Sequence, residues 1–76
     1  MAPTNRRLPA SERYSVTLVP PAVEAIGKLV EVTGLTKTDV INRAVQIYAF
    51  LEERMAEGSE VVLRDPNGQY ERVHIV

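Results

Sequence analysis

Polar and apolar residues alternate along residues 13–19, whose sequence is RYSVTLV. Successive side chains of a β-strand point to opposite faces, so this two-residue period predicts a strand with one buried face and one face open to solvent. The strand is expected to end at Pro20 and Pro21, because proline has no amide hydrogen to donate to a ladder. The apolar positions are Tyr14, Val16 and Leu18, and the polar positions are Arg13, Ser15 and Thr17.

The pattern then changes to a helical period. Val23, Ile26 and Val30 recur at spacings of three and four, which predicts an amphipathic helix over residues 21–33. Proline suits the first turn of such a helix, where the amide has no partner in any case. Gly34 is expected to end the helix in the left-handed conformation.

A second helix is predicted from the cap sequence TKTD, residues 36–39, to about Glu57, with Gly58 after it. Thr36 with an acid at Asp39 nearly matches the capping box, in which an N-cap hydroxyl and an acid three residues on satisfy each other's amides. This helix carries two adjacent apolar stripes, a surface broader than one short helix can cover. The first stripe is Ile41, Ala44, Val45, Tyr48, Leu51 and Met55, and the second is Val40, Ile47 and Phe50.

The C-terminal segment, residues 59–76, predicts a β-hairpin. Two strand-like runs, EVVLR and QYERVHIV, flank the turn sequence Asp65-Pro66-Asn67-Gly68. Proline suits the second position of a type I turn, and Asn-Gly is expected to supply positive φ values. Loops of two and of three residues give different registers, and both stay open.

Composition narrows the class of protein. A chain of 76 residues is one small domain whose stability alone is marginal, and such domains usually add disulfides, a metal or a second subunit. Cysteine is absent, and the single histidine, His74, cannot build a zinc site alone, so a second subunit is expected. We also expect no cofactor and no catalysis, because no nucleophile–base set or phosphate-binding glycine loop occurs. Without a membrane span or an apolar signal segment, a cytoplasmic location is expected.

The net charge of -1 argues against a nucleic-acid partner, but the charges are unevenly placed. Residues 1–43 hold six Lys/Arg against four Asp/Glu, and residues 44–76 hold three against six. The N-terminal part is therefore positive and the C-terminal part negative, an asymmetry that makes an anionic partner for the N-terminal part reasonable.

The predicted strand has no candidate partner among the helices that follow it. Unpaired strand edges are templates for another chain, and the same segment of a second copy is the simplest partner. Two copies pairing antiparallel would place their apolar faces on a core of four helices and their polar faces together on the outside. The expected dimer core comprises Tyr14, Val16, Leu18, Ile41, Val45 and Tyr48.

This order of elements resembles the ribbon–helix–helix family of bacterial and phage DNA-binding repressors. The resemblance covers about residues 12–57 and is carried by the strand sequence RYSVTLVPP and by TGLTKTDVINRA, which agrees in caps, apolar spacing and length together. It implies a mainly α fold with short β: a ribbon–helix–helix homodimer over residues 13–58. Residues 1–12 would be a flexible arm, and residues 59–76 a C-terminal hairpin outside the shared core.

The resemblance also implies where double-stranded DNA would bind. Arg13, Ser15 and Thr17 would read base edges from a ribbon in the major groove, which admits two strands and carries a unique donor/acceptor code. Thr36, Lys37 and Thr38 would hold a phosphate at the second helix's N-terminus, where free amides and the helix dipole favour anions. Arg6 and Arg7 on the arm could follow the backbone or enter a minor groove. The plainer alternatives are a solvated strand face, a simple helix cap and solubilising charge.

Three functions share these contacts. The first is a transcriptional repressor. The second is the antitoxin of a toxin–antitoxin pair, with a toxin as protein partner bound through residues 59–76. The third is an accessory protein of plasmid partition or transfer. Antitoxin tails are commonly disordered when free, so the strong turn sequence favours the repressor.

Overall fold

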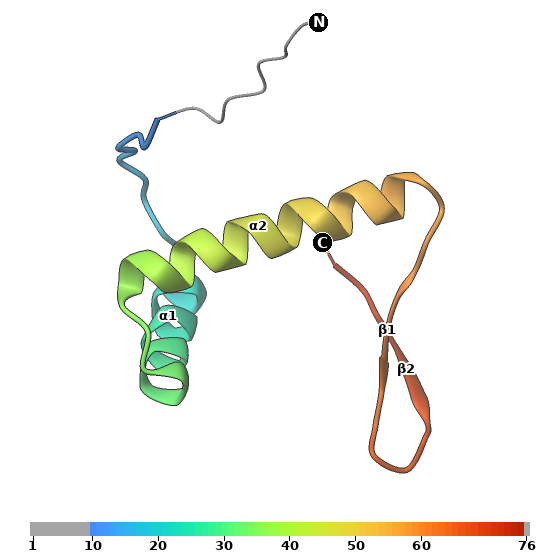
Figure 1. Cartoon of the computed structure of the whole chain (residues 1–76). Coiled ribbons are helices and arrows are strands. Elements are labelled where there is room, and N and C mark those ends of the chain that lie inside the picture. Colours follow the sequence, from blue (N-terminus) through green and yellow to red (C-terminus); the bar gives the residue numbers. More distant parts are fainter. Residues whose placement is uncertain (1–9, 76) are drawn as a thin grey trace, which may run out of the picture.

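The computed structural model describes residues 10–75, and residues 1–9 and 76 lie outside that range. It is a small mixed α/β chain with two helices and a two-stranded antiparallel sheet. The elements are α1 (Pro20–Thr33), α2 (Lys37–Ala56), β1 (Val61–Arg64) and β2 (Tyr70–Val73). Figure 1 shows α2 as the central element, with α1 at its N-terminal end and the β1–β2 hairpin at its C-terminal end.

Both predicted helices are present, with ends within one residue of the prediction, because each end is set by a local signal. Val19 precedes α1 in an extended conformation, and prolines occupy the first turn. Gly34 follows with φ of 74°, and its amide donates to the carbonyl of Val30 at 2.9 Å. That left-handed conformation has no Cβ penalty in glycine, which explains why the helix stops there.

The hairpin is present, and its loop settles the register. Val61 pairs with Val73 and Arg64 with Tyr70, leaving Pro66, Asn67 and Gly68 in the loop between Asp65 and Gln69. The expectation that both Asn67 and Gly68 have positive φ is wrong, since only Gly68 does, with φ of 86°. The Asp65 carboxylate explains the difference: its Oδ1 accepts from the amides of Asn67 at 2.9 Å and Gln69 at 2.8 Å, holding Asn67 in an ordinary turn.

Residues 13–19 form no strand in the single chain, and the described sheet contains β1 and β2 alone. A β-ladder needs a hydrogen-bonding partner, and no described strand of the same chain provides one. The intermolecular ribbon therefore remains a prediction about an assembly of two chains.

The described chain has almost no interior of its own. Among residues 10–75, Val40 is the only buried apolar side chain, at 4% exposure, and it lies on α2 where that helix meets α1. Val16, Val32 and Tyr70 are among many large apolar side chains left exposed. A small domain with so little core needs further contacts to be stable.

Candidate nucleic-acid interface

The segment before α1 and the N-terminal half of α2 together form an open groove of about 590 Å³. Its apolar lining is Tyr14, Val16, Leu18, Ile41 and Val45, so five of the six predicted dimer-core residues meet within one chain. The sixth, Tyr48, does not line it. The spacing of the three segment residues matches the predicted alternation.

This groove is uncovered in the single chain. Tyr14 is 78% exposed, Val16 70% and Val45 63%, although all three are large and apolar. Ser15 and Thr17, the intervening polar residues, are exposed and lie outside the groove lining. The segment thus has an apolar side turned to α2 and a polar side turned away from it.

Arg13 departs from strict alternation. It is exposed and lines the end of the groove together with Glu12 and Tyr14. The Tyr14 hydroxyl donates to Oε1 of Glu12 at 2.8 Å, which holds that carboxylate near the groove end. No ion pair to Arg13 or Lys37 is found in the described part of the chain, and both side chains are exposed.

The N-terminus of α2 adjoins the same groove, because Thr38 and Asn42 also line it. Thr36 is the N-cap, and its Oγ1 accepts from the amide of Asp39 at 3.1 Å. Half of the predicted capping box is therefore formed, and no return bond from the amide of Thr36 to Asp39 is found among the described residues. The amides of Lys37 and Thr38, the first two of the helix, likewise have no acceptor there.

Asn42 was not identified from the sequence. Its Nδ2 donates to the carbonyl of Thr38 at 2.8 Å, which fixes a polar side chain at the groove wall one turn into α2. The available signal was its position four residues after Thr38, on the same helical face. Arg6 and Arg7, the predicted arm contacts, lie outside the described residues.

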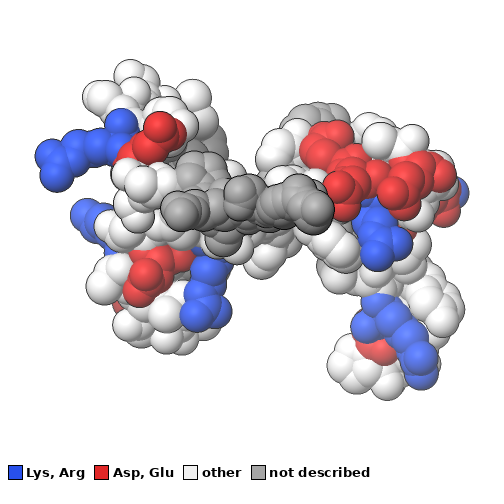
Figure 2. Space-filling view, turned by 45° about the horizontal axis from the view of Figure 1, so that its top comes forward, with Lys and Arg blue, Asp and Glu red and all other residues white. Residues whose placement is uncertain are grey.

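Charge is divided between the two ends of the molecule. Figure 2 shows acidic side chains gathered over the C-terminal end of α2, where Glu52, Glu53 and Glu57 occur. The hairpin carries an exposed ion pair between Arg72 and Glu60 at 3.1 Å. The groove lies at the opposite end of α2, so the acidic cluster does not surround it.

Tyr48 lies on α2 beyond the groove. Its hydroxyl donates to Oε2 of Glu52 at 2.8 Å. This hydrogen bond is the main reason that the pKa of Tyr48 is raised, and the negative charge of Glu52 is the second. The pair marks the point on α2 where the apolar stripe of Ile41 and Val45 gives way to acidic residues.

Residues 10–75 carry neither a metal-binding cluster nor a membrane-spanning helix. No group of three or more His, Asp or Glu side chains is placed to hold a metal ion in residues 10–75. Neither α1 nor α2 is long and apolar enough to cross a membrane. Comparisons of the chain with family models, with characterised proteins and with solved structures find no match.

Proposed function

We propose that this chain is a homodimeric, sequence-specific DNA-binding protein of the ribbon–helix–helix type that acts as a transcriptional repressor. The observation that carries the proposal is the two-sided segment at residues 14–18. Its apolar side chains line a groove with Ile41 and Val45 and are left uncovered, and its polar side chains face away from that groove.

A second copy explains both sides of the segment. Antiparallel pairing of two such segments satisfies their free backbone groups and lets each cover the other chain's apolar groove. The same pairing repeats Ser15 and Thr17 on the outer surface, with Arg13 beside them at the open end of the groove. Arginine can give a bidentate fork to guanine O6 and N7, and hydroxyls can donate to or accept from neighbouring base edges.

The N-terminus of α2 supplies a separate contact to the DNA backbone. The amides of Lys37 and Thr38 have no acceptor in the described chain and lie at the positive end of a twenty-residue helix. A phosphate there would be held by those amides, by the helix dipole and by the Lys37 side chain. Thr38 also lines the groove, so base-reading and phosphate-binding groups belong to one continuous surface.

The decisive experiment selects the bound DNA sequence from a random pool and then measures the affinity of variants for it. Arg13→Ala is expected to lose about 1–3 kcal/mol of specific binding while the chain still folds and dimerises. Lys28→Ala is the matched control, because it removes the same charge from an exposed position on α1, away from the groove lining. An Arg13→Ala/Thr17→Ala protein that still protects the same operator would contradict the proposal.

The hairpin bears on the antitoxin alternative. β1 and β2 pair with each other within the single chain. A segment that has its own turn and register differs from a tail that orders only on a toxin. Purification from the native cell, with and without residues 59–76, tests this: a stoichiometric small protein lost with the tail would favour the antitoxin.

A further inference from the structure

The two faces of the β1–β2 hairpin differ in character. The register places the pairs Val61–Val73 and Leu63–Glu71 on one face, and the pairs Val62–Arg72 and Arg64–Tyr70 on the other. We refer to Val61, Leu63 and Val73 as the apolar hairpin face. Glu71 is the only charged residue among the four paired positions of that face and lies towards the turn.

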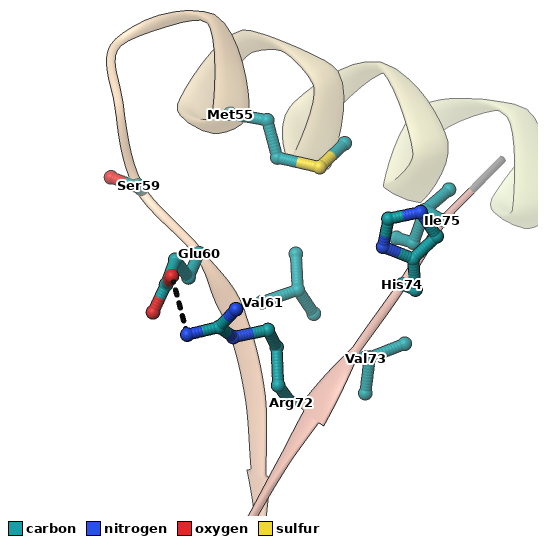
Figure 3. Close-up of a pocket in the computed structure, with 8 residues that line it drawn as sticks. All are labelled: Met55, Ser59, Glu60, Val61, Arg72, Val73, His74 and Ile75. Carbon is teal, nitrogen blue, oxygen red and sulfur yellow. Dashed lines mark ion pairs between the residues drawn. The ribbon is translucent and has the colours of Figure 1, made fainter.

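Only one end of the apolar hairpin face is covered within the chain. Val61 and Val73 are half-buried and, with Met55 and Ile75, line a pocket of about 270 Å³ at the end of α2. Figure 3 shows this pocket beneath α2, with the Glu60–Arg72 ion pair at one side. Leu63 lies farther along the hairpin and stays 58% exposed.

A hairpin in this position needs more cover than α2 provides. An isolated two-stranded hairpin is marginally stable at best in water, and it requires a further strand or packing on a helix. Here α2 reaches only the open end, at Met55. Leu63 is left without cover by the described chain, and contact with another surface would stabilise the hairpin.

The apolar hairpin face continues a partly covered row of apolar residues on α2, which takes members from both predicted stripes. Val40, Ala44, Ile47, Leu51 and Met55 recur at spacings of three and four, so they share one face of the helix. We call them the inner stripe. Val40 is buried and Leu51 and Met55 are half-buried, but Ile47 between them is 58% exposed.

The open part of the inner stripe forms a groove of about 320 Å³. Ala44 and Ile47 line it from α2, and Leu29 and Leu35 line it from the α1 side. The apolar surface therefore extends from α1, along α2, to the hairpin. It also lies beside the groove that residues 14–18 form with Ile41 and Val45, which we call the ribbon groove. Val40 and Ala44 directly precede Ile41 and Val45 on α2.

The size of a stable interface indicates what covers this surface. A specific protein interface uses roughly 20–30 residues a side. The predicted dimer core names six apolar residues per chain, so an interface of that size extends beyond them to neighbouring surface. A second copy is already required to cover the ribbon groove, and the adjacent inner stripe and hairpin give the additional contact area.

We propose that a second copy of this chain packs on the inner stripe and on the apolar hairpin face, so that the hairpin is an intersubunit contact of the same homodimer. Leu63 is then an interface residue, and Glu71 lies at the solvent-exposed rim. Val62, on the opposite face of β1, stays in solvent. This inference depends on the homodimer of the proposed function, but not on DNA binding.

The test compares two neighbouring substitutions in the full chain, Leu63→Lys and Val62→Lys. Both place a lysine in β1 at a position that is exposed in the single chain, so their effects on strand propensity and net charge are matched. Sedimentation equilibrium over a dilution series measures the dimer dissociation constant. Leu63→Lys is expected to weaken the dimer by at least about tenfold, because it places a charge in an apolar contact, and Val62→Lys by less than about threefold.

Two further measurements separate this inference from its alternatives. The amide signal of Gly68 in the NMR spectrum reports whether the hairpin is still formed, and Leu63→Met, which conserves volume, is expected to restore dimerisation. Equal weakening by both lysine variants, or an unchanged dimer with an intact hairpin in Leu63→Lys, would overturn the proposal. So would capture of a different protein through Leu63 with self-association unchanged. A Leu63-dependent dimer that selects no DNA sequence would refute the proposed function and support this inference.

Discussion

Tyr48 and Glu52 are joined by a side-chain hydrogen bond on α2. The phenol donates to the carboxylate one turn further along α2, at 2.8 Å. This bond and the charge of Glu52 both favour the protonated phenol, and they raise the pKa of Tyr48 above that of an ordinary tyrosine. The stabilisation is therefore fully present below the ordinary tyrosine pKa and is lost as the pH rises through the raised value.

We expect Glu52→Ala to lower the pKa of Tyr48 towards its ordinary value, because it removes both the acceptor and the charge, which are the two largest causes of the shift. Glu52→Gln keeps an acceptor and removes only the charge, so it should give an intermediate pKa. The measurement is the phenolate absorbance as the pH is raised, with the titration of the Tyr48→Phe variant subtracted. Identical titrations for the wild type and Glu52→Ala would show that the bond is not formed in solution.

Thr36 and Lys37 are neighbours with separable roles. Thr36→Ala removes the hydroxyl that accepts from the Asp39 amide, so it should lower the free energy of unfolding by about 1 kcal/mol. Lys37→Ala removes an exposed charge and should change stability by less than about 0.5 kcal/mol. Chemical denaturation measures both effects.

The same two variants test the phosphate contact when DNA affinity is measured at several salt concentrations. Lys37→Ala should weaken binding to all sequences alike and reduce the slope of log affinity against log salt by about 1. An unchanged slope would remove Lys37 from the set of phosphate contacts.

At the scale of elements, the ends of both helices were predictable because each depends on residues close by in the sequence. The bounds of α1 and α2 follow from prolines, a cap threonine and Gly34, each acting within one turn. The loop of the hairpin was less predictable because its sequence is compatible with two loop lengths. Two hydrogen bonds to the Asp65 carboxylate favour the three-residue loop, in which Gly68 alone has positive φ.

The candidate site was likewise predictable only in part from the sequence. Alternation in the sequence predicted that Tyr14, Val16 and Leu18 would share a surface, and they line one groove. Arg13 and Asn42 line that groove because of the way the segment lies across α2. The periodicity of the sequence does not predict this orientation. Residues 13–19 form no strand in the single chain, and the proposed ribbon would need the same segment of a second chain as its hydrogen-bonding partner.

At the scale of the whole molecule, the exposed apolar surface supports the proposed dimer, and charge differs between the two ends of α2. Val40 alone is buried among the described residues, and several of the exposed apolar residues line two grooves on α2. Glu52, Glu53 and Glu57 gather at the C-terminal end of α2 (Figure 2), whereas Glu12 is the only acidic residue in the groove lining. A dimer joined through the groove would present its less acidic end to an anionic partner, which reconciles a net charge of -1 with DNA binding.

Adjacent residues of the segment provide the sharpest test of that assembly. Val16 is 70% exposed in the single chain, so Val16→Asp has little to disrupt unless a second copy covers it. We expect this variant to be monomeric and largely unfolded at concentrations where the wild type is a folded dimer, because burial of an unpaired carboxylate is costly. Ser15→Asp, on the opposite side of the segment, should keep the dimer and lose DNA binding, since it would place a negative charge in the groove of a polyanion.

Thermal melting over a wide range of protein concentration distinguishes these outcomes. The Tm of the wild type and of Ser15→Asp should rise with concentration, as mass action requires when folding and association are linked. Val16→Asp should show no such rise. A wild-type Tm independent of concentration, together with a monomer mass for a folded chain, would mean that each chain completes its own core, and the ribbon would then have no second strand.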